Sequence, residues 1–493
     1  MFALLLLTGW ALAEKPAAKT PPNIILISVD GMRLDHAHFG GNPNATSPNM
    51  DALVKDGVWF KNSWSQSNES LYSHASIFSG QYAGELGPPN YLEYILPEDA
   101  IVIPEVLKII GYDTASFQSG GHIGRGFGFE QGFDIVKEGA DFGSFHETTK
   151  FASIWLEGRS GNTKPFFMFL HGYDCHRPYK HNSVFHHPFD PTYRGPMEEL
   201  VAARNKTETT FDRVYYRIPN QRRILHEAGH KMLDPATYIQ LKKEAQEGKY
   251  KVKHEYNDRD IEHLKAHYDS GVLAADTYLG IFFEKLGQLN LWDNTLIILT
   301  SDHGEDLQDH GFTNHRAVLM DSTTLVPMVL SGGYIPKEMR GKTFDMLTEA
   351  RDVFPTIASV VGTSPPAKAT GNDLWAVVMG ADMPKKDFVF QQGVLGHVSV
   401  RTKRHRLVFS GVMPLDPDFK TKLMTAKPES KYISLFQSET DTDEIIDIKN
   451  TEPEVTAQLL NALQQWYDTL PEETERHTLS AEQMRVLQEG GYW

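Results

Sequence analysis

Metal-binding residue types follow two apolar runs in this chain. Asp30 comes after the run at 23–29 (NIILISV), and Asp302 and His303 come after a similar run at 294–300 (NTLIILT). Such runs are typical of buried strands in a parallel sheet, whose ligands gather beyond the carboxyl ends of the strands. Each aspartate taken alone is more typical of a turn or a helix cap. Together, the two strand ends predict a site for one divalent cation, such as Ca, Mn or Zn.

A serine lies where a nucleophile could be activated. Ser70 comes just before a helix that we expect over 72–78, which Gly80 ends. The free N–H groups at a helix N-terminus favour an anion and lower the pKa of a nearby hydroxyl. A serine at this position is therefore either a nucleophile or an N-cap, and N-cap serines are the commoner kind.

The elements that would position these residues indicate an α/β fold. Buried strands are expected at 23–29, 165–170, 294–300 and 325–330, and helices at 47–57 and 260–289. Strands that alternate with helices form an open sheet with helices on its faces. Each of the first three strands ends close to Asp or His, so the chemistry is expected at one edge of this sheet.

Changes in composition divide the chain into regions. Residues 1–13 (MFALLLLTGWALA) end in an A-x-A sequence, which is typical of a secretory signal peptide, and a linker follows at 14–22. A catalytic domain is expected over 23–365, with a mostly helical insertion at 186–257. Residues 366–493 are expected to form a smaller subdomain, with strands near 388–394, 398–400 and 406–410 and a helix at 454–470.

The overall composition excludes several classes of protein. The 493 residues carry 48 Lys and Arg against 64 Asp and Glu, a net charge of −16, which repels nucleic acid. The single cysteine, Cys175, excludes an internal disulfide and a cysteine-based zinc cluster. No apolar stretch reaches the length of about 20 residues that a transmembrane helix needs. We therefore expect a periplasmic or secreted protein with no transmembrane segment in the mature chain.

Several motifs, in order, resemble those of the sulfatase branch of the alkaline phosphatase superfamily. They are 22–30 (PNIILISVD), 33–36 (RLDH), 47–62 (SPNMDALVKDGVWFKN), 174–179 (DCHRPY), 300–305 (TSDHGE) and 309–315 (DHGFTNH). The likeness runs from about residue 21 to residue 492, apart from the insertion. It implies an alkaline phosphatase-like central mixed sheet flanked by helices, with a smaller C-terminal α+β subdomain.

The resemblance also implies roles for individual residues. Asp30, Asp302 and His303 match metal ligands, and Ser70 matches the nucleophile because Gly80 follows ten residues later, as in the family motif. The remaining candidates are His176 and His315 to hold the anionic group, His122 as a further catalytic residue, and His74 and Asp174 to contact substrate. A second metal held by Asp174, His176 and His315 is an alternative.

Three positions depart from the sulfatase pattern. Tyr72 and His74 stand where the family has the Pro and Arg that the formylglycine-generating enzyme reads, and Gly31 replaces a second metal-binding Asp. These changes disfavour formylglycine at Ser70. They resemble instead the hydroxyl-nucleophile relatives, such as nucleotide pyrophosphatase/phosphodiesterases.

The sequence therefore predicts a metal-dependent hydrolase of sulfuric or phosphoric esters that uses Ser70 and a covalent intermediate. One alternative is a phosphodiesterase or phospho-group transferase with unmodified Ser70. Another is a catalytically inactive sulfatase-like binding protein. The expected substrate is a small-molecule, glycan or lipid-headgroup ester, and no motif identifies its organic part.

Overall fold

The structure is a computed structural model. It describes residues 21–87, 95–140, 142–177, 179, 185, 188–195, 197, 257–310, 313–316, 319–393, 396–410 and 418–471. The predicted signal peptide, most of the predicted linker and most of the predicted insertion lie outside these residues. Among the helices of the described segments, none is both long and apolar enough to cross a membrane.

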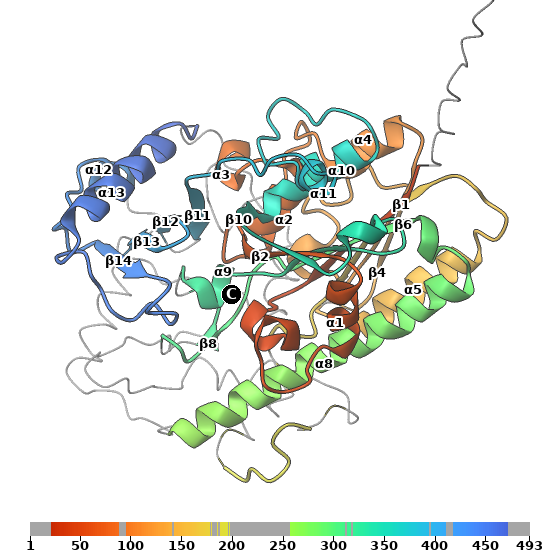
Figure 1. The fold of residues 1–493 in the computed structure, drawn as a ribbon, viewed down its shortest axis with the longest axis horizontal. Helices are drawn as coiled ribbons and strands as arrows, with labels where there is room; N and C mark the ends of the chain where they lie inside the picture. Colours follow the sequence, from red (N-terminus) through yellow and green to blue (C-terminus); the bar gives the residue numbers. More distant parts are fainter. Residues whose placement is uncertain are drawn as a thin grey trace, which may run out of the picture.

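An eight-stranded mixed sheet forms the centre of the molecule (Figure 1). In spatial order its strands are β10 (Lys342–Glu349), β2 (Val58–Trp64), β9 (Met328–Ser331), β6 (Thr295–Thr300), β1 (Asn23–Val29), β5 (Phe166–Gly172), β3 (Asp113–Gln118) and β4 (Ile135–Glu138). β1 pairs in parallel with β5 and β6, whereas β9 runs antiparallel to β6 and β2. The four predicted strands are β1, β5, β6 and β9, and they lie side by side, which confirms the expected α/β fold.

Helices cover both faces of this sheet because the strands are apolar on both sides. Ile24 and Leu26 of β1 face α2 (Ser70–Ser79), α4 (Ile103–Ile109), α10 (Val353–Val360) and α11 (Leu374–Val378). Ile25 and Ile27 face the opposite layer, made of α1 (Pro48–Lys55), α5 (Phe145–Glu157) and α8 (Asp258–Gln288). In α8 the N-cap Asn257 accepts a hydrogen bond from the Asp260 backbone N–H at 3.1 Å, which fixes the start of the helix.

A second, antiparallel sheet lies beside the first (Figure 1). It consists of β11 (Val389–Gly393), β12 (His397–Arg401), β13 (His405–Phe409) and β14 (Ile433–Gln437). Helices α12 (Phe419–Met424) and α13 (Pro453–Asp468) pack on it and share an apolar core with its strands. The smaller elements are α3 (Ala83–Leu86), β7 (Asp306–Leu307), β8 (Thr313–Asn314) and α9 (Asp321–Thr324).

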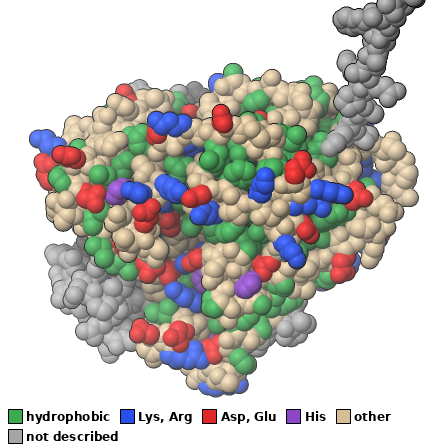
Figure 2. Space-filling view, in the orientation of Figure 1, with side chains coloured by type: hydrophobic (Ala, Val, Ile, Leu, Met, Phe, Trp, Pro, Cys, Tyr) green, Lys and Arg blue, Asp and Glu red, His purple; other side chains and the backbone are tan. Residues whose placement is uncertain are grey.

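The molecular surface carries both signs of charge. Figure 2 shows Lys and Arg side chains interspersed with Asp and Glu over one face of the molecule, without a continuous basic area on that face.

Candidate active site

Three predicted metal ligands converge because β1 and β6 are neighbouring parallel strands. Asp30, Asp302 and His303 follow these strands and are fully buried. Asp302 Oδ1 accepts hydrogen bonds from the Gly31 N–H at 3.1 Å and the His303 N–H at 2.9 Å. His303 Nδ1 donates to the Gly304 carbonyl oxygen at 2.9 Å, so Nε2 is the ring nitrogen left to face the carboxylates, 3.4 Å from Asp302 Oδ2.

The charge state of this cluster favours a cation. Asp30 Oδ1 and Asp302 Oδ2 are buried and have no hydrogen-bond partner among the described residues. Burial and the adjacent Asp302 raise the pKa of Asp30 well above its ordinary value. Burial acts in the same direction on Asp302, but His303, His74 and His171 hold the pKa of Asp302 below its ordinary value. Two buried carboxylates this close need a counter-charge to ionise together, so the donor set fits a divalent metal.

Ser70 lies against this cluster at the N-terminus of α2. Its Oγ donates to Asp30 Oδ2 at 3.2 Å and lies 3.1 Å from His303 Nε2. The helix begins at Ser70 itself, two residues earlier than expected, because the extended residue Glu69 takes the N-cap position. The hydroxyl therefore does not cap its own helix, and its geometry agrees with the nucleophile interpretation.

A second histidine cluster stacks on the first. The His315 ring lies 4.0 Å from that of His303, and the His176 ring lies 5.3 Å from that of His315. Glu305 Oε1 lies 3.0 Å from His315 Nδ1. His176, Glu305 and His315 could themselves hold a metal ion. The structure thus groups His176 and His315 with Glu305 rather than with Asp174.

The two histidines differ in charge. Burial lowers the pKa of His176 to about 3, with help from His315 and His303, so the His176 ring is neutral. Burial also disfavours a charged His315, but Glu305 and Glu69 outweigh it and raise the pKa of His315. Burial raises the pKa of Glu305, yet His315 and His176 together bring it to about 2. Glu305 and Glu69 therefore favour the protonated form of His315 beside the predicted metal site.

Glu69, which the sequence did not single out, lies beside Ser70 and contacts further charged groups. Its carboxylate is fully buried, 2.7 Å from His122 Nδ1 and 2.7 Å from Arg316 Nε. Burial opposes ionisation of Glu69, but Arg316 and His122 hold the pKa of Glu69 well below its ordinary value. His122, the loosest of the motif matches, thus lies in contact with the residue that precedes Ser70.

The two residues expected to contact substrate have internal partners. His74 Nδ1 donates to the Ser70 carbonyl oxygen at 2.8 Å, and Ser28 Oγ lies 3.0 Å from His74 Nε2. Asp174 Oδ2 accepts the Phe145 N–H at 2.8 Å at the start of α5, and burial raises the pKa of Asp174 to about 7. Both interactions hold the backbone near the site.

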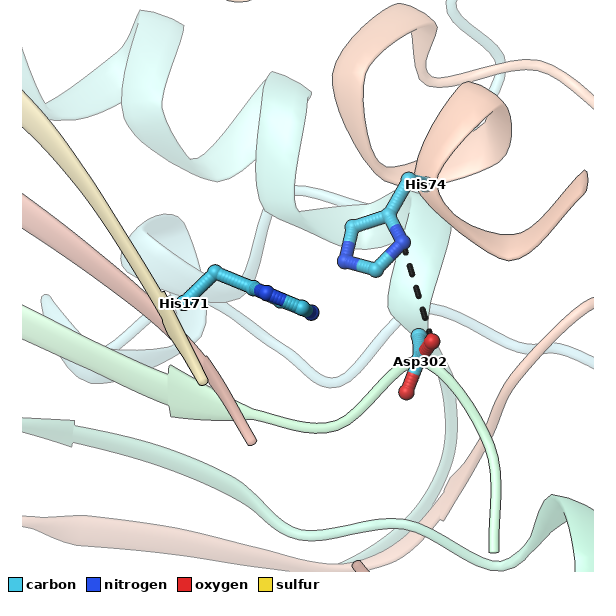
Figure 3. Close-up of side chains that lie close together, drawn as sticks. All are labelled: His74, His171 and Asp302. Carbon is cyan, nitrogen blue, oxygen red and sulfur yellow. Dashed lines mark ion pairs between the residues drawn. The ribbon is translucent and has the colours of Figure 1, made fainter. Parts of the chain in front are cut away.

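Figure 3 shows His74 approaching Asp302 from helix α2 and His171 approaching from the end of β5. His74 Nδ1 lies 3.7 Å from Asp302 Oδ2. Burial, with the neighbouring His74, lowers the pKa of His171 well below its ordinary value, so the His171 ring is neutral. His171 was also missed, because a single histidine at the end of an apolar run gives no periodic signal.

Comparison with known proteins agrees with this architecture. A family model described as Sulfatase matches residues 22–363. An arylsulfatase from Clostridium perfringens is 23% identical over 434 residues, which span 79% of this chain and 85% of that protein.

Two solved structures illustrate the shared fold. One, in complex with its substrate D-glucosamine-2-N,6-O-disulfate, has a TM-score of 0.67 at 19% identity and covers 92% of this chain and 100% of that chain. The phosphonate monoester hydrolase of Agrobacterium radiobacter has a TM-score of 0.63 at 18% identity and covers 91% of this chain and 96% of that chain. The family match extends over more than half of the sequence, so this chain belongs to the sulfatase family of the alkaline phosphatase superfamily and is an ester hydrolase of that superfamily.

Proposed function

We propose that this chain is a divalent-metal-dependent hydrolase of phosphoric or sulfuric esters in which the Ser70 hydroxyl is the nucleophile. One observation carries the proposal. Ser70 Oγ lies at a helix N-terminus, 3.2 Å from Asp30 Oδ2 and 3.1 Å from His303 Nε2, where it caps no N–H group. This arrangement combines a buried hydroxyl, a cation-binding donor set and a helix dipole at one atom.

Asp30, Asp302 and His303 would hold the metal. When bound, the ion would supply positive charge that lowers the pKa of the Ser70 hydroxyl and neutralises the anionic group of the ester. Asp30 Oδ2 already accepts the hydroxyl hydrogen bond of Ser70, so the Ser70 proton points toward a carboxylate.

Ser70, His315 and His176 each have a part in the reaction. Ser70 Oγ attacks the phosphorus or sulfur atom in line with the bond to the leaving oxygen, and that bond breaks as the Ser70 ester forms. His315, whose charged form Glu305 and Glu69 favour, neutralises an oxygen of the transferred group. The neutral His176 beside it donates through Nδ1 to the Arg177 carbonyl oxygen, so its Nε2 can accept a hydrogen bond from the attacking water. Water then cleaves the Ser70 ester, which releases the anion and restores the hydroxyl.

The surroundings of Ser70 favour phosphoric over sulfuric esters. Tyr72 and His74 replace the two residues that formylglycine formation needs, and His74 is bonded to the Ser70 carbonyl oxygen inside the protein. A sulfated serine lacks the elimination route that formylglycine provides, whereas a phosphorylated serine can be hydrolysed by water. Relatives of both kinds are known, since the similar proteins include an arylsulfatase and a phosphonate monoester hydrolase. A phosphodiesterase or phospho-group transferase is therefore the second candidate.

The N-terminal sequence and a solved neighbour support proposals for the location of the protein and for the class of its substrate. Residues 1–13 support export to the periplasm or the medium. A solved neighbour binds a sulfated glucosamine, so a glycan ester is one substrate class to test beside small-molecule and lipid-headgroup esters.

The test is a rate comparison on one purified preparation. An aryl sulfate, an aryl phosphate and a bis-aryl phosphodiester are assayed with Ca, Mn or Zn, for the wild type and for Ser70→Ala. Ser76→Ala is the matched control, because Ser76 is a buried serine of the same helix whose hydroxyl has no hydrogen-bond partner among the described residues. Phosphate turnover that disappears only in Ser70→Ala supports the proposal.

Other outcomes of this comparison have distinct meanings. Sulfate turnover, together with an aldehyde at position 70 in peptide mass spectrometry, would show that Ser70 is modified despite Tyr72 and His74. Equal rates for wild type and Ser70→Ala would exclude Ser70 as the nucleophile. The absence of turnover and of bound metal in the wild type would support the inactive binding protein.

A further inference from the structure

His171 is the second-last residue of β5 and lies beside the predicted metal site. β1 and β5 pair in parallel with Ser28 opposite His171, so both side chains lie on the same face of the sheet. This is the face that packs against α2, because Phe167 and Phe169 of the same strand belong to that core. The register therefore places the His171 ring between the sheet and the helix that carries Ser70.

The His171 ring is buried without hydrogen bonds. Its side chain has no solvent exposure, and neither Nδ1 nor Nε2 has a hydrogen-bond partner among the described residues. Rings surround it, with Tyr173 at 4.7 Å and His74 at 5.2 Å between ring centroids. A buried polar nitrogen left unsatisfied costs about 1–3 kcal/mol, so this histidine needs a partner that offsets the cost.

The nearest charged atom to His171 Nε2 is a metal-ligand candidate. Nε2 lies 3.3 Å from Asp30 Oδ2, the same oxygen that accepts the Ser70 hydroxyl at 3.2 Å. His171 also forms, with His74 and Asp302, a group whose donor atoms all lie within 4.8 Å of one another, and this group shares Asp302 with that of Asp30, Asp302 and His303. Donor atoms at ordinary ligand distances of about 2.0–2.2 Å from one tetrahedral ion lie roughly 3.4 Å apart, and the 3.3 Å between His171 Nε2 and Asp30 Oδ2 matches this spacing.

The adjacent His74 provides an internal comparison. Both of its ring nitrogens have partners, since Nδ1 donates to the Ser70 carbonyl oxygen and Nε2 lies 3.0 Å from Ser28 Oγ. His74 thus holds the backbone at the nucleophile, whereas His171, equally buried and on the facing element, has two nitrogens without such bonds. The two histidines therefore differ in what they can still bind.

We propose that His171 is an additional ligand of the cation held by Asp30, Asp302 and His303. The assignment rests on the proposed metal site and deepens it. The ligand set then contains two carboxylates and two imidazoles, with the Ser70 hydroxyl beside them. Imidazole nitrogens suit Zn or Mn, whereas Ca takes oxygen donors, so the site should select Zn or Mn over Ca.

The experiment counts imidazole ligands on the metal directly. Wild-type protein is stripped with a chelator, reloaded with Zn²⁺ and examined by X-ray absorption at the zinc edge, which resolves the number of coordinated imidazoles. We expect two in the wild type and one in His171→Gln. The zinc affinity of His171→Gln, measured by competition with a chelating dye, should fall at least about tenfold.

The matched control is His405→Gln. His405 lies on β13 in the second sheet, away from the predicted metal site, and pairs with Glu452 at 3.1 Å. This variant should keep two imidazoles on zinc and the wild-type zinc affinity.

Each outcome decides the assignment. A wild-type spectrum with a single imidazole overturns it, even if His171→Gln fails to fold. Unchanged affinity and imidazole number in a folded His171→Gln also overturn it and leave the proposed function standing. A wild type that takes up no Zn, Mn or Ca overturns the proposed metal dependence, and the ligand assignment falls with it.

Discussion

Replacement of Arg406 by methionine tests the buried charges that join the two sheets. Arg406 on β13 is fully buried, and its Nη1 donates to the Leu319 carbonyl oxygen at 3.1 Å and to Glu444 Oε2 at 3.2 Å. Its Nη2 donates to Thr324 Oγ1 at 2.8 Å and lies 2.9 Å from Asp321 Oδ1. One guanidinium thus links the second sheet to Leu319 and to helix α9.

The size of the effect follows from charge balance. Arg401 and Arg406 face Asp321 and Glu444, so two positive and two negative groups share the interior. Methionine fills much of the volume of Arg406 but leaves this group with an excess negative charge. Loss of one partner from a buried pair costs about 3–5 kcal/mol, which we expect for Arg406→Met in the free energy of unfolding.

A double variant and a surface control define the cause. Arg406→Met combined with Glu444→Gln removes one charge of each sign, and it should be more stable than the sum of the single effects by at least about 1 kcal/mol. Arg404→Met removes an exposed arginine that lies 3.4 Å from Glu439. The Arg404 change should alter stability by less than about 1 kcal/mol, as surface pairs do.

The assay is urea unfolding at neutral pH, followed by tryptophan fluorescence and circular dichroism. An Arg406→Met variant within about 1 kcal/mol of wild type, or strictly additive single effects, would refute the buried-charge argument. Either result would mean that water reaches these four groups.

Three further perturbations have defined outcomes. Burial raises the pKa of Asp174 to about 7 from 3.8, so the protonated carboxyl is favoured in the folded state and stability falls as pH rises through this interval. Asp174→Asn keeps an acceptor for the Phe145 N–H. In thermal unfolding this variant should be more stable than the wild type at pH 8 by up to about 4 kcal/mol, and equally stable near pH 4. An equal stability difference at both pH values would contradict burial of the carboxyl as the cause. Cys175 is fully buried and burial raises the pKa of its thiol, so a thiol reagent should label it only after denaturant is added, and rapid labelling of native protein would exclude this burial. Glu69→Gln removes the buried charge that pairs with Arg316. For whichever ester the wild type hydrolyses, kcat should fall about 10- to 100-fold, with KM less affected. An unchanged kcat would exclude a positioning role for Glu69.

The convergence of the metal-ligand candidates was predictable because it depends on the order of strands more than on detailed packing. Asp30 and Asp302 are far apart in the chain, yet each follows an apolar run that is readable as a buried strand. The parallel pairing of β1 with β6 then brings the two carboxylates together. Chain order and residue type were sufficient for this part of the candidate site.

Other contacts depended on features that a sequence pattern does not encode. The position of His171 opposite Ser28 follows from the register of β5 against β1, which a continuous apolar run leaves open. Asp174 was expected near substrate, but the loop after β5 turns it toward the start of α5. Glu69 precedes Ser70, and its role as a counter-ion depends on Arg316 and His122, which approach it from distant segments of the chain.

Two departures from the sulfatase pattern lie beside the same carboxylate. Gly31 removes a negative side chain and His74 removes a positive one, and both positions contact Asp302, through the Gly31 N–H at 3.1 Å and His74 Nδ1 at 3.7 Å. Together they conserve the net charge around the carboxylates and leave Asp30, Asp302 and His303 in place. The altered motif therefore agrees with a cation site of different donor chemistry better than with a site that has decayed into an inactive binding protein.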